Sequence, residues 1–316
     1  MTRILVTGAV GQIGSELVPA LRARYGGDNV IALGRKTQPS DEMRRAGPFL
    51  FADVLDKDAM REIITKHGIT HIYHLAGMVS AAAEKDPSRG WAVNFETLKI
   101  VLDLAVELKL QQVFWPSSIA VFGPGAPKQA TPQQTVLDPT TIYGVAKVAG
   151  ELLCSYYHAR FGLDVRSLRY PGIISYQTEP GGGTTDYAVA IFYDALRSGS
   201  YTCFVREDTV LPMMYMDDCI KATIDLMSAD ASRINVRTSY NLAAMSFSAK
   251  ELAAEVAKRI PGFTCAYAPD HRQAIASSWP QTIDDSAARR DWGWKPAFDL
   301  PAMSEVMLTA LKNKFS

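Results

Sequence analysis

Apolar and polar positions along the first half of the chain follow the pattern of short strands that alternate with longer helices. Apolar, β-branched and aromatic runs predict strands at residues 3–8, 29–34, 49–54, 71–76, 112–117 and 165–171. Stretches with helical spacing lie between them, among them residues 14–26, 56–68 and 97–110. This order predicts an α/β fold with a doubly wound parallel sheet and helices on both faces.

The alternation breaks after Pro171, which divides the chain in two. Residues 179–186, "EPGGGTTD", form a glycine-rich loop, and the part that follows mixes helices with short strands. We therefore predict a first domain at residues 1–170 and a smaller C-terminal α/β lobe at residues 171–316. A segment at about residues 210–235 is expected to return to the first domain.

Charge and cysteine content narrow the class of protein. Lys plus Arg and Asp plus Glu both total 33, so no global field favours nucleic acid or an anionic membrane. No apolar run reaches 18 residues, and the N-terminus does not resemble a secretory signal. The four cysteines are dispersed and the histidines form no metal motif. These patterns predict a cytoplasmic protein with no metal.

The first chemical motif is the glycine-rich turn "VTGAVGQIGSEL" near the N-terminus. It follows a predicted strand and opens a predicted helix, so its backbone can approach a ligand and free N–H groups face a pyrophosphate. A strand–helix turn that merely needs glycine is the simpler interpretation, but the setting favours a dinucleotide. The expected contacts are Gly8, Gly11, Gln12, Ile13 and Gly14.

The end of the second predicted strand leaves the choice between NAD and NADP open. The acidic residue that usually binds the adenosine ribose of NAD is replaced by Gly34, and Arg35 and Lys36 follow. The two cations could hold the 2′-phosphate of NADP or simply be solvated. Asp53 and Val54 are expected near the adenine. Leu75, Ala76 and Gly77 follow the next predicted strand, where parallel sheets bind ligands.

Tyr143 and Lys147 lie four positions apart in "TIYGVAK" and would share one face of a helix. A nearby ammonium is expected to lower the pKa of the phenol, which could then act as a general base toward an alcohol. Ser117 and Ser118, at the end of the fifth predicted strand, could orient the substrate oxygen. A Tyr and a Lys on a solvated face are the simpler interpretation, which the ordered glycines and serines disfavour.

The chain resembles the extended branch of the short-chain dehydrogenase/reductase superfamily. The resemblance runs through "TGAVGQIG", "ADV", "HLAG", "SSIAVFG", "YGVAK", "RYPGII" and "WGWKP" and covers nearly the whole sequence. It implies a Rossmann domain, a Ser-Tyr-Lys triad at Ser118, Tyr143 and Lys147, and hydride transfer to nicotinamide C4. By the same resemblance, the residues beside the nicotinamide are Tyr170, Pro171 and Ile173.

Within that branch, "PGGGTTDYAV", "LPMMYMDD" and "SSWPQTIDD" are similar to the L-threonine 3-dehydrogenase group. The resemblance implies metal-independent oxidation of the β-hydroxyl of L-threonine to 2-amino-3-oxobutanoate, with NAD. The implied substrate contacts are Ser80, Ser117, Ser118, Tyr143, Gly183, Thr184, Thr185 and Trp279. Trp279 could equally be a core residue.

Two alternatives and one assembly prediction complete the interpretation. The same fold could serve an NDP-sugar epimerase or dehydratase, with Arg206 and Arg272 on the diphosphate, or a module that binds the cofactor without chemistry.

The predicted helices at residues 97–110 and 143–162 both carry wide apolar faces. These helices are expected to pair with their copies across a two-fold axis, which makes a homodimer. A simpler possibility is that the same chain covers these faces.

Overall fold

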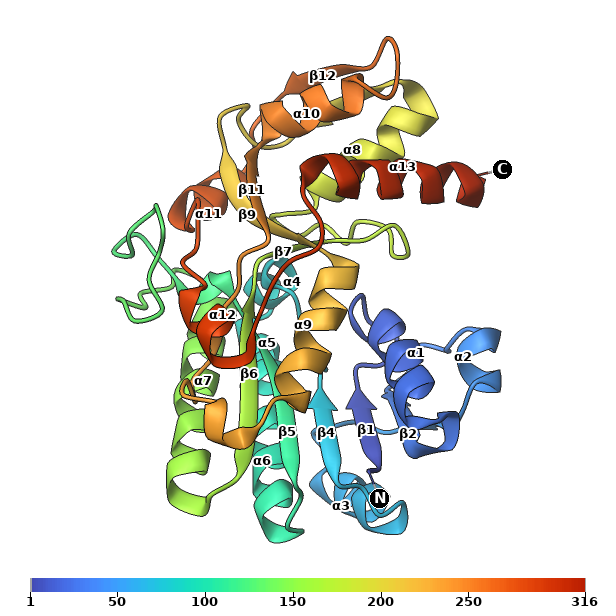
Figure 1. The fold of residues 1–316 in the computed structure, drawn as a ribbon, viewed down its shortest axis with the longest axis vertical. Helices are drawn as coiled ribbons and strands as arrows, with labels where there is room; N and C mark the ends of the chain where they lie inside the picture. Colours follow the sequence, from blue (N-terminus) through green and yellow to red (C-terminus); the bar gives the residue numbers. More distant parts are fainter. Residues whose placement is uncertain (1, 316) are drawn as a thin grey trace. The chain divides into compact units, whose positions relative to one another are not determined.

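A seven-stranded sheet in the order β10-β6-β5-β4-β1-β2-β3 forms the centre of the first unit of the computed structural model (Figure 1). Neighbouring strands from β3 to β5 pair in parallel, which confirms the predicted α/β fold. The structure describes residues 2–315. The strands are β1 (Ile4–Thr7), β2 (Val30–Gly34), β3 (Phe49–Phe51), β4 (His71–His74), β5 (Gln112–Ser118), β6 (Asp164–Tyr170) and β10 (Tyr240–Asn241).

The helices of this unit follow the strands along the chain. A short π-helix (Ala92–Glu96) leads directly into α6. The helices are α1 (Gly14–Tyr25), α2 (Asp41–Arg45), α3 (Lys57–Lys66), α4 (Ser80–Lys85), α5 (Pro87–Trp91), α6 (Thr97–Glu107) and α7 (Ile142–Phe161), and α9 (Met216–Ser228) joins them for most of its length. Two 3₁₀ turns, Gly27–Asn29 and Ala231–Arg233, complete the unit.

The second unit is built on two small sheets. In one, β9 pairs with β7 in parallel and with β11 in antiparallel fashion, and in the other β12 pairs with β8 in parallel. The strands are β7 (Gly172–Ile174), β8 (Ser200–Cys203), β9 (Val210–Tyr215), β11 (Met245–Ser248) and β12 (Thr264–Tyr267). The helices are α8 (Tyr187–Ser198), α10 (Ala249–Ala257), α11 (Arg272–Ser278), α12 (Ser286–Trp292) and α13 (Leu300–Phe315), with a 3₁₀ turn at Ile119–Val121.

The division of the chain is more interleaved than one boundary near residue 170. The first unit comprises residues 1–118, 141–169 and 220–240, and the second comprises 119–140, 170–219 and 241–316. The returning segment therefore begins at residue 220, inside α9, rather than near residue 210. The excursion at 119–140 has no counterpart in the prediction, because a loop that leaves a sheet and comes back has no periodicity to mark it.

Local sequence explains where α7, the helix that carries Tyr143, begins and ends. The Thr141 side chain accepts a hydrogen bond from the Gly144 backbone N–H at 3.1 Å, which caps the first turn. The helix ends at Phe161 and is capped by Gly162, whose φ of 68° lies in the left-handed region. A cap at each end fixes the length of α7 and the starting point of its first turn.

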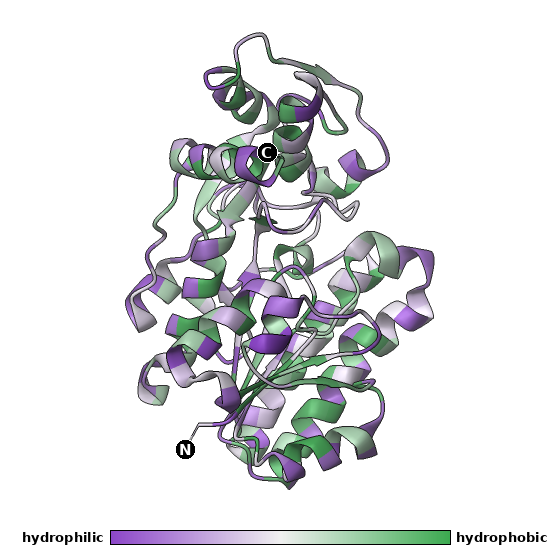
Figure 2. Ribbon diagram, turned by 90° about the vertical axis from the view of Figure 1, so that its right-hand side faces the viewer, coloured by the Kyte–Doolittle hydropathy of each residue, from purple (hydrophilic) through white to green (hydrophobic). Residues whose placement is uncertain are grey.

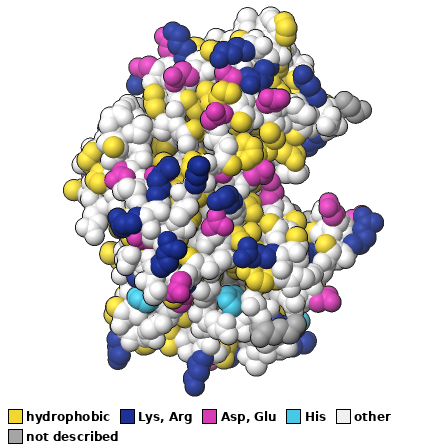
Figure 3. All heavy atoms as spheres, viewed as in Figure 1, with side chains coloured by type: hydrophobic (Ala, Val, Ile, Leu, Met, Phe, Trp, Pro, Cys, Tyr) yellow, Lys and Arg dark blue, Asp and Glu magenta, His cyan; other side chains and the backbone are white. Residues whose placement is uncertain are grey.

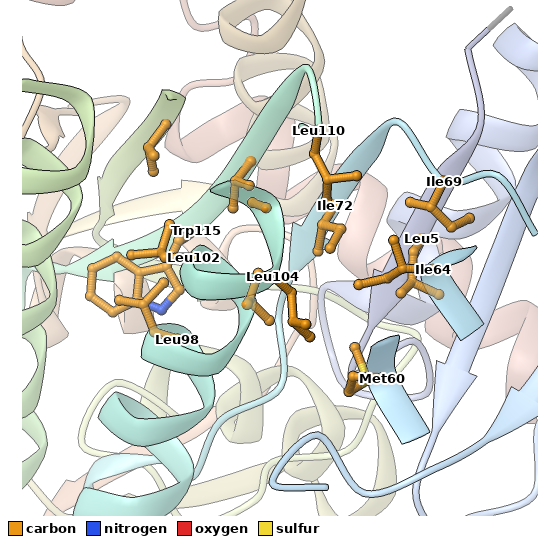
Figure 4. Close-up of a cluster of buried hydrophobic side chains, with 14 of the residues drawn as sticks. Leu5, Met60, Ile64, Ile69, Ile72, Leu98, Leu102, Leu104, Leu110 and Trp115 are labelled. Carbon is orange, nitrogen blue, oxygen red and sulfur yellow. The ribbon is translucent and has the colours of Figure 1, made fainter. Parts of the chain in front are cut away.

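Apolar side chains between the sheet and its helices form the core of the first unit. Every residue of β1 and β2 is buried, and Figure 2 shows the strands of the large sheet mostly in the colour of hydrophobic residues. In Figure 4, Trp115 of β5 lies beside Leu98 and Leu102 of α6. On the face drawn in Figure 3, basic and acidic side chains are interspersed. Among the described residues, no helix is long and apolar enough to cross a membrane.

Trp115 also determines which residue α7 can carry opposite it. A methyl group added at Gly150 would lie 2.3 Å from Cη2 of Trp115, well inside van der Waals contact. We expect Gly150→Ala to lower the free energy of unfolding by about 1–3 kcal/mol, as overpacked cores do. Urea denaturation measures the change.

Two further variants test the cause. Gly181→Ala is the matched control, since a methyl group there would have no atom within 4 Å. Trp115→Phe combined with Gly150→Ala should cost less than the sum of the two single changes, because the smaller ring leaves room for the methyl group. Strict additivity would show that Trp115 is not the obstacle.

Candidate active site

The glycine-rich turn between β1 and α1 is shaped by close backbone contacts. Gly8 has a φ of 68°, and a methyl group on it would lie 2.7 Å from the Ala76 backbone nitrogen. A methyl group on Gly14 would lie 2.3 Å from the Gly8 carbonyl oxygen. The backbones of β1, β4 and α1 therefore converge where no side chain fits, which is the cradle a pyrophosphate requires.

A cavity of about 290 Å³ opens beside this turn, inside the first unit. Eight of the predicted cofactor contacts line it: Gly8, Gly11, Arg35, Asp53, Val54, Leu75, Ala76 and Gly77. Gln12, Ile13 and Gly14 form the start of α1 next to it. Sequence analysis missed further lining residues, among them Val10, Thr37, Met78, Arg89, Val93 and Thr97.

Packing explains why the end of β2 has no acidic side chain. A methyl group on Gly34 would lie 2.8 Å from Cζ of Phe49 on β3, so any side chain there would require the Phe49 ring to move. An acid reaches the same cavity from Asp53, whose carboxylate lies 3.5 Å from the Arg35 guanidinium. Arg35 thus already has a negative partner, which weakens its attraction for a 2′-phosphate.

A buried chain of hydrogen bonds connects β1, β4 and α6 beside the cavity, which Thr97 lines. Thr7 Oγ1 lies 2.8 Å from Nδ1 of His74, and Nε2 of His74 lies 2.9 Å from Thr97 Oγ1. The Thr97 hydroxyl donates to the Val93 carbonyl at 2.6 Å, so Nε2 must carry the ring proton and Nδ1 must accept from Thr7. Burial lowers the pKa of His74 to about 3, which keeps the ring neutral.

Asn94, which sequence analysis missed, holds the loop after β4. Its Oδ1 accepts from the Met78 backbone N–H at 2.8 Å, and its Nδ2 donates to the Met78 carbonyl at 3.1 Å. Asn94 lies in the π-helix, whose wider turn directs one buried polar side chain at this loop. A lone polar residue in the apolar run "WAVNF" was the available signal.

Ser118, Tyr143 and Lys147 come together where β5 ends and α7 begins. Ser118 forms a side-chain hydrogen bond with Tyr143. Lys147 Nζ lies 5.4 Å from the centre of the Tyr143 ring and donates to the Pro116 carbonyl at 2.5 Å. Glu84 of α4 accepts from the Ile142 N–H at 2.6 Å, which anchors the first turn of α7.

The pKa of Tyr143 differs from the sequence-based prediction. Burial raises the pKa of Tyr143 to about 12, and the hydrogen bond from Ser118 opposes this only in part. The pKa of Lys147 falls to about 7, because its ammonium is buried as well. The prediction of a lowered phenol pKa was wrong for this arrangement, since helical spacing shows that two groups are neighbours but not that both lose water.

The two adjacent serines face different surroundings. The Ser117 hydroxyl donates to the buried carboxylate of Glu151 at 2.6 Å, away from Tyr143, so only Ser118 remains suited to a substrate oxygen. Ser80, at the start of α4, has a buried hydroxyl with no hydrogen-bond partner among the described residues. An unpartnered buried hydroxyl is a candidate ligand contact.

The remaining predicted residues belong to the second unit. Thr185 packs against Gly172 of β7, next to Ile173, and Thr184 is buried. The Gly183 N–H donates to Asp186 at 2.8 Å, so this end of the glycine loop is held. Tyr170 and Pro171 precede β7. Trp279 is buried and lines a cavity of about 160 Å³ with Lys128 and Arg206.

Comparison with known proteins places the chain in a family. The model of the NAD dependent epimerase/dehydratase family matches residues 4–243. The chain belongs to this family. The mitochondrial L-threonine 3-dehydrogenase of Bos taurus is 49% identical over 97% of the chain and 82% of the bovine protein.

Two solved structures are similar over almost their full length. The GalE-like L-threonine dehydrogenase from Cupriavidus necator, in its holo form, is 50% identical with a TM-score of 0.95, covering 98% of this chain and 99% of that one. A monomeric L-threonine 3-dehydrogenase from a metagenome is 48% identical with a TM-score of 0.95, covering 99% of this chain and 100% of that one.

The cofactor named by the family fits the first unit. The Gly8–Gly14 cradle would take the pyrophosphate, while Asp53 and Val54 would face the adenosine end of the cavity. In an epimerase/dehydratase fold these contacts all come from loops at the carboxyl ends of parallel strands. The residues present therefore fit NAD.

The buried ammonium of Lys147 has a consequence for stability. Its ordinary pKa is 10.5 and its pKa in the folded protein is about 7. Between these values the unfolded chain binds a proton that the folded chain lacks, so stability rises with pH. Lys147→Met removes the cost and should raise the free energy of unfolding at pH 7 by about 2–4 kcal/mol, at roughly 1.4 kcal/mol per pKa unit less the lost contacts.

Urea denaturation at pH 7, 8, 9 and 10 tests this expectation. The advantage of Lys147→Met should shrink steadily as the pH approaches the unfolded value. Lys66→Met, at an exposed position on α3, should show no such trend. A Lys147→Met advantage that is independent of pH would rule out a charged, desolvated lysine as its origin.

Proposed function

We propose that this protein oxidises the β-hydroxyl of L-threonine to 2-amino-3-oxobutanoate with NAD as hydride acceptor. The observation that carries the proposal is the joint placement of Ser118, Tyr143 and Lys147 at the carboxyl end of β5, in the unit that holds the dinucleotide cradle. The near full-length similarity to L-threonine dehydrogenases supports the substrate. The cytoplasmic location of the protein stays a prediction.

Each side chain has a defined task in the proposed reaction. The Tyr143 oxygen takes the hydroxyl proton, and the Ser118 hydroxyl, which already contacts Tyr143, holds the substrate oxygen beside it. NAD, when bound, supplies the acceptor for the hydride that leaves the β-carbon and adds a positive charge near the phenol. Lys147 stabilises the phenolate when its own ammonium is charged.

Burial gives Tyr143 and Lys147 resting protonation states that differ from those the reaction needs. A phenol whose pKa is raised to about 12 rests in the protonated form, and a lysine whose pKa is lowered to about 7 is readily neutral. The active form needs the opposite arrangement, with tyrosine as base and lysine charged. Groups that stabilise the ammonium of Lys147 therefore contribute directly to the rate.

The substrate's amino-acid group needs polar contacts of its own. We propose Ser80 as one of them, because its hydroxyl is buried and has no partner among the described residues, and because α4 packs against α7. Thr184 and Thr185 stay predictions for the same task. Ser117 is omitted, since its hydroxyl is committed to Glu151.

The NDP-sugar alternative has less support in the second unit. The Arg272 guanidinium donates to Asp270 at 2.6 Å and lies over the Phe204 ring. Arg206 donates to Asp208 at 3.1 Å. Both cations assigned to a diphosphate thus have acidic partners, which reduces their attraction for a further anion.

Tyr143→Phe tests the reaction directly. It removes the proton acceptor and keeps the ring, so turnover of L-threonine with NAD should fall about 100-fold or more while NAD binding is retained. Formation of reduced nicotinamide measures the rate, with L-serine and UDP-sugars as competing substrates. Tyr25→Phe, at the end of α1 and outside both the site and the α7 surface, is the control and should be unchanged.

Two outcomes would contradict the proposal. Tyr143→Phe activity within a few-fold of the parent would remove Tyr143 from its role. Conversion of a UDP-sugar, with no threonine-dependent reduction of NAD by the parent, would favour the epimerase alternative.

We also propose a homodimer formed through α7. The helix exposes an apolar stripe of Val145, Leu152 and Tyr156, with Leu152 61% exposed. The second apolar face predicted for α6 cannot contact a partner chain in the same way, because Leu104 is fully buried within the unit. The proposal of a dimer therefore depends on the exposed stripe of α7. The similar L-threonine 3-dehydrogenase from a metagenome is described as monomeric, which is the alternative result.

Light scattering decides the oligomeric state. The parent should have about twice the mass of one chain at micromolar concentration. Leu152→Glu should produce a stable monomer, because it places a charge in the contact but removes no buried side chain. Val136→Glu alters an apolar loop residue of similar exposure and should remain dimeric. A monomeric parent would overturn the proposal.

A further inference from the structure

The end of β5 is tied to α7 by consecutive residues. The Pro116 carbonyl accepts from Lys147 Nζ at 2.5 Å, and the Ser117 hydroxyl donates to Glu151 Oε1 at 2.6 Å. The next residue, Ser118, is hydrogen-bonded to Tyr143. Any shift of β5 along α7 would thus alter these contacts together.

Glu151 is itself held by a buried ion pair. Arg169, near the end of β6, donates from Nε to Oε1 at 2.9 Å and from Nη2 to Oε2 at 2.7 Å. The side chains of Glu151 and Arg169 are only 1% and 3% exposed. A pair of this kind is often no more stabilising than a well-packed apolar pair, so fold stability alone gives little reason for a charged one here.

Helical spacing connects the ion pair with the chemistry. Tyr143, Lys147 and Glu151 lie at i, i+4 and i+8 of α7 and share one face. Through Ser117, Glu151 fixes the strand residue that precedes Ser118. The distance between Ser118 and Tyr143 therefore depends on where Glu151 holds the strand.

Glu151 also acts on the charge of Lys147. The ammonium lies 4.3 Å from the centre of the Trp115 ring, and burial brings its pKa down to about 7. Cys154 and the negative charge of Glu151, one turn along α7, both oppose that fall. The other groups around Lys147 are Tyr143 and Cys154 on α7, a neutral His74 on β4, and Arg169, whose positive charge offsets part of the effect of Glu151.

We propose that Glu151 is a positioning residue for the dehydrogenase centre, where it fixes Ser118 against Tyr143 through Ser117 and keeps Lys147 charged. The proposal rests on the proposed function for its kinetic part. Its electrostatic part concerns Lys147 alone and is independent of the substrate. The competing account is a purely structural brace between α7 and β6.

Three variants separate geometry, charge and stability. Glu151→Gln keeps the shape and an acceptor for Ser117 but removes the charge. Ser117→Ala keeps the charge but removes the tether. Asp164→Asn is the matched control, because it breaks a mostly buried ion pair between Asp164 and Arg166 at the start of β6. Asp164 lies five residues, or about 17 Å along the strand, from Arg169.

The kinetic readout is kcat against pH with L-threonine and NAD. Glu151→Gln should lower kcat at least about 10-fold and move the whole pH profile to lower pH, since loss of a negative charge lowers the pKa of both Tyr143 and Lys147. Ser117→Ala should lower kcat several-fold and leave the profile in place. Asp164→Asn should change neither, and the KM for NAD should stay within about three-fold throughout.

An activity-independent readout follows Lys147 through Trp115. The ammonium lies over the indole, so its titration should change Trp115 emission, measured as the difference from a Trp115→Phe variant. The midpoint should disappear in Lys147→Met and move to lower pH in Glu151→Gln. If Glu151→Gln does not fold, Glu151→Gln with Arg169→Gln leaves no unpaired buried charge, and its midpoint should move in the same direction by a smaller amount, because Glu151 acts on Lys147 more strongly than Arg169 does.

The outcomes are distinct. A Glu151→Gln variant with parental kcat, or one that loses activity while both the pH profile and the emission midpoint stay in place, overturns the proposal in favour of a structural brace. A shifted emission midpoint in a protein that does not oxidise threonine supports the electrostatic role of Glu151 and refutes the proposed function instead.

Discussion

The packing of α7 against the end of β5 is the contact on which the rest of the site depends. Gly150 lets α7 approach the Trp115 ring, and this approach brings Lys147 over the same ring and its Nζ to the Pro116 carbonyl. Lys147 is buried as a result, and Tyr143 is shielded from most of the solvent. The site therefore gains a dry environment, in which charges act strongly, and a lysine whose ammonium is costly to maintain.

Sequence predicted the parts whose signal is local. Glycine spacing located the turn that converges on Ala76, and strand–helix alternation predicted the parallel sheet. It did not predict the direction of the Tyr143 pKa, because desolvation depends on how closely α7 approaches β5. It placed Ser118 in the triad but kept Ser117 as a second candidate for the substrate oxygen, and the bond from Ser117 to the buried Glu151 separates the two.

At the adenosine end of the cavity, too, sequence alone could not predict which residues lie side by side. Gly34 looked like the loss of an acid, yet the neighbouring strand supplies the reason in the ring of Phe49 and a substitute in the carboxylate of Asp53. The pairing of β2 with β3 makes these residues neighbours although they are distant in sequence. Cofactor choice in this protein is thus a property of two adjacent strands.

The hydrogen-bonded chain from Thr7 through His74 to Thr97 has one more consequence, for behaviour in acid. Each group in it donates in one direction, so a second proton on the buried ring would force the Thr7 hydroxyl to turn its own proton away. With a pKa of about 3 in the folded protein and 6.5 otherwise, His74 takes up a proton only as the chain unfolds. Acidification below pH 6.5 therefore draws the equilibrium toward the unfolded chain, and a single imidazole at the centre of the sheet makes proton uptake a driving force for acid unfolding.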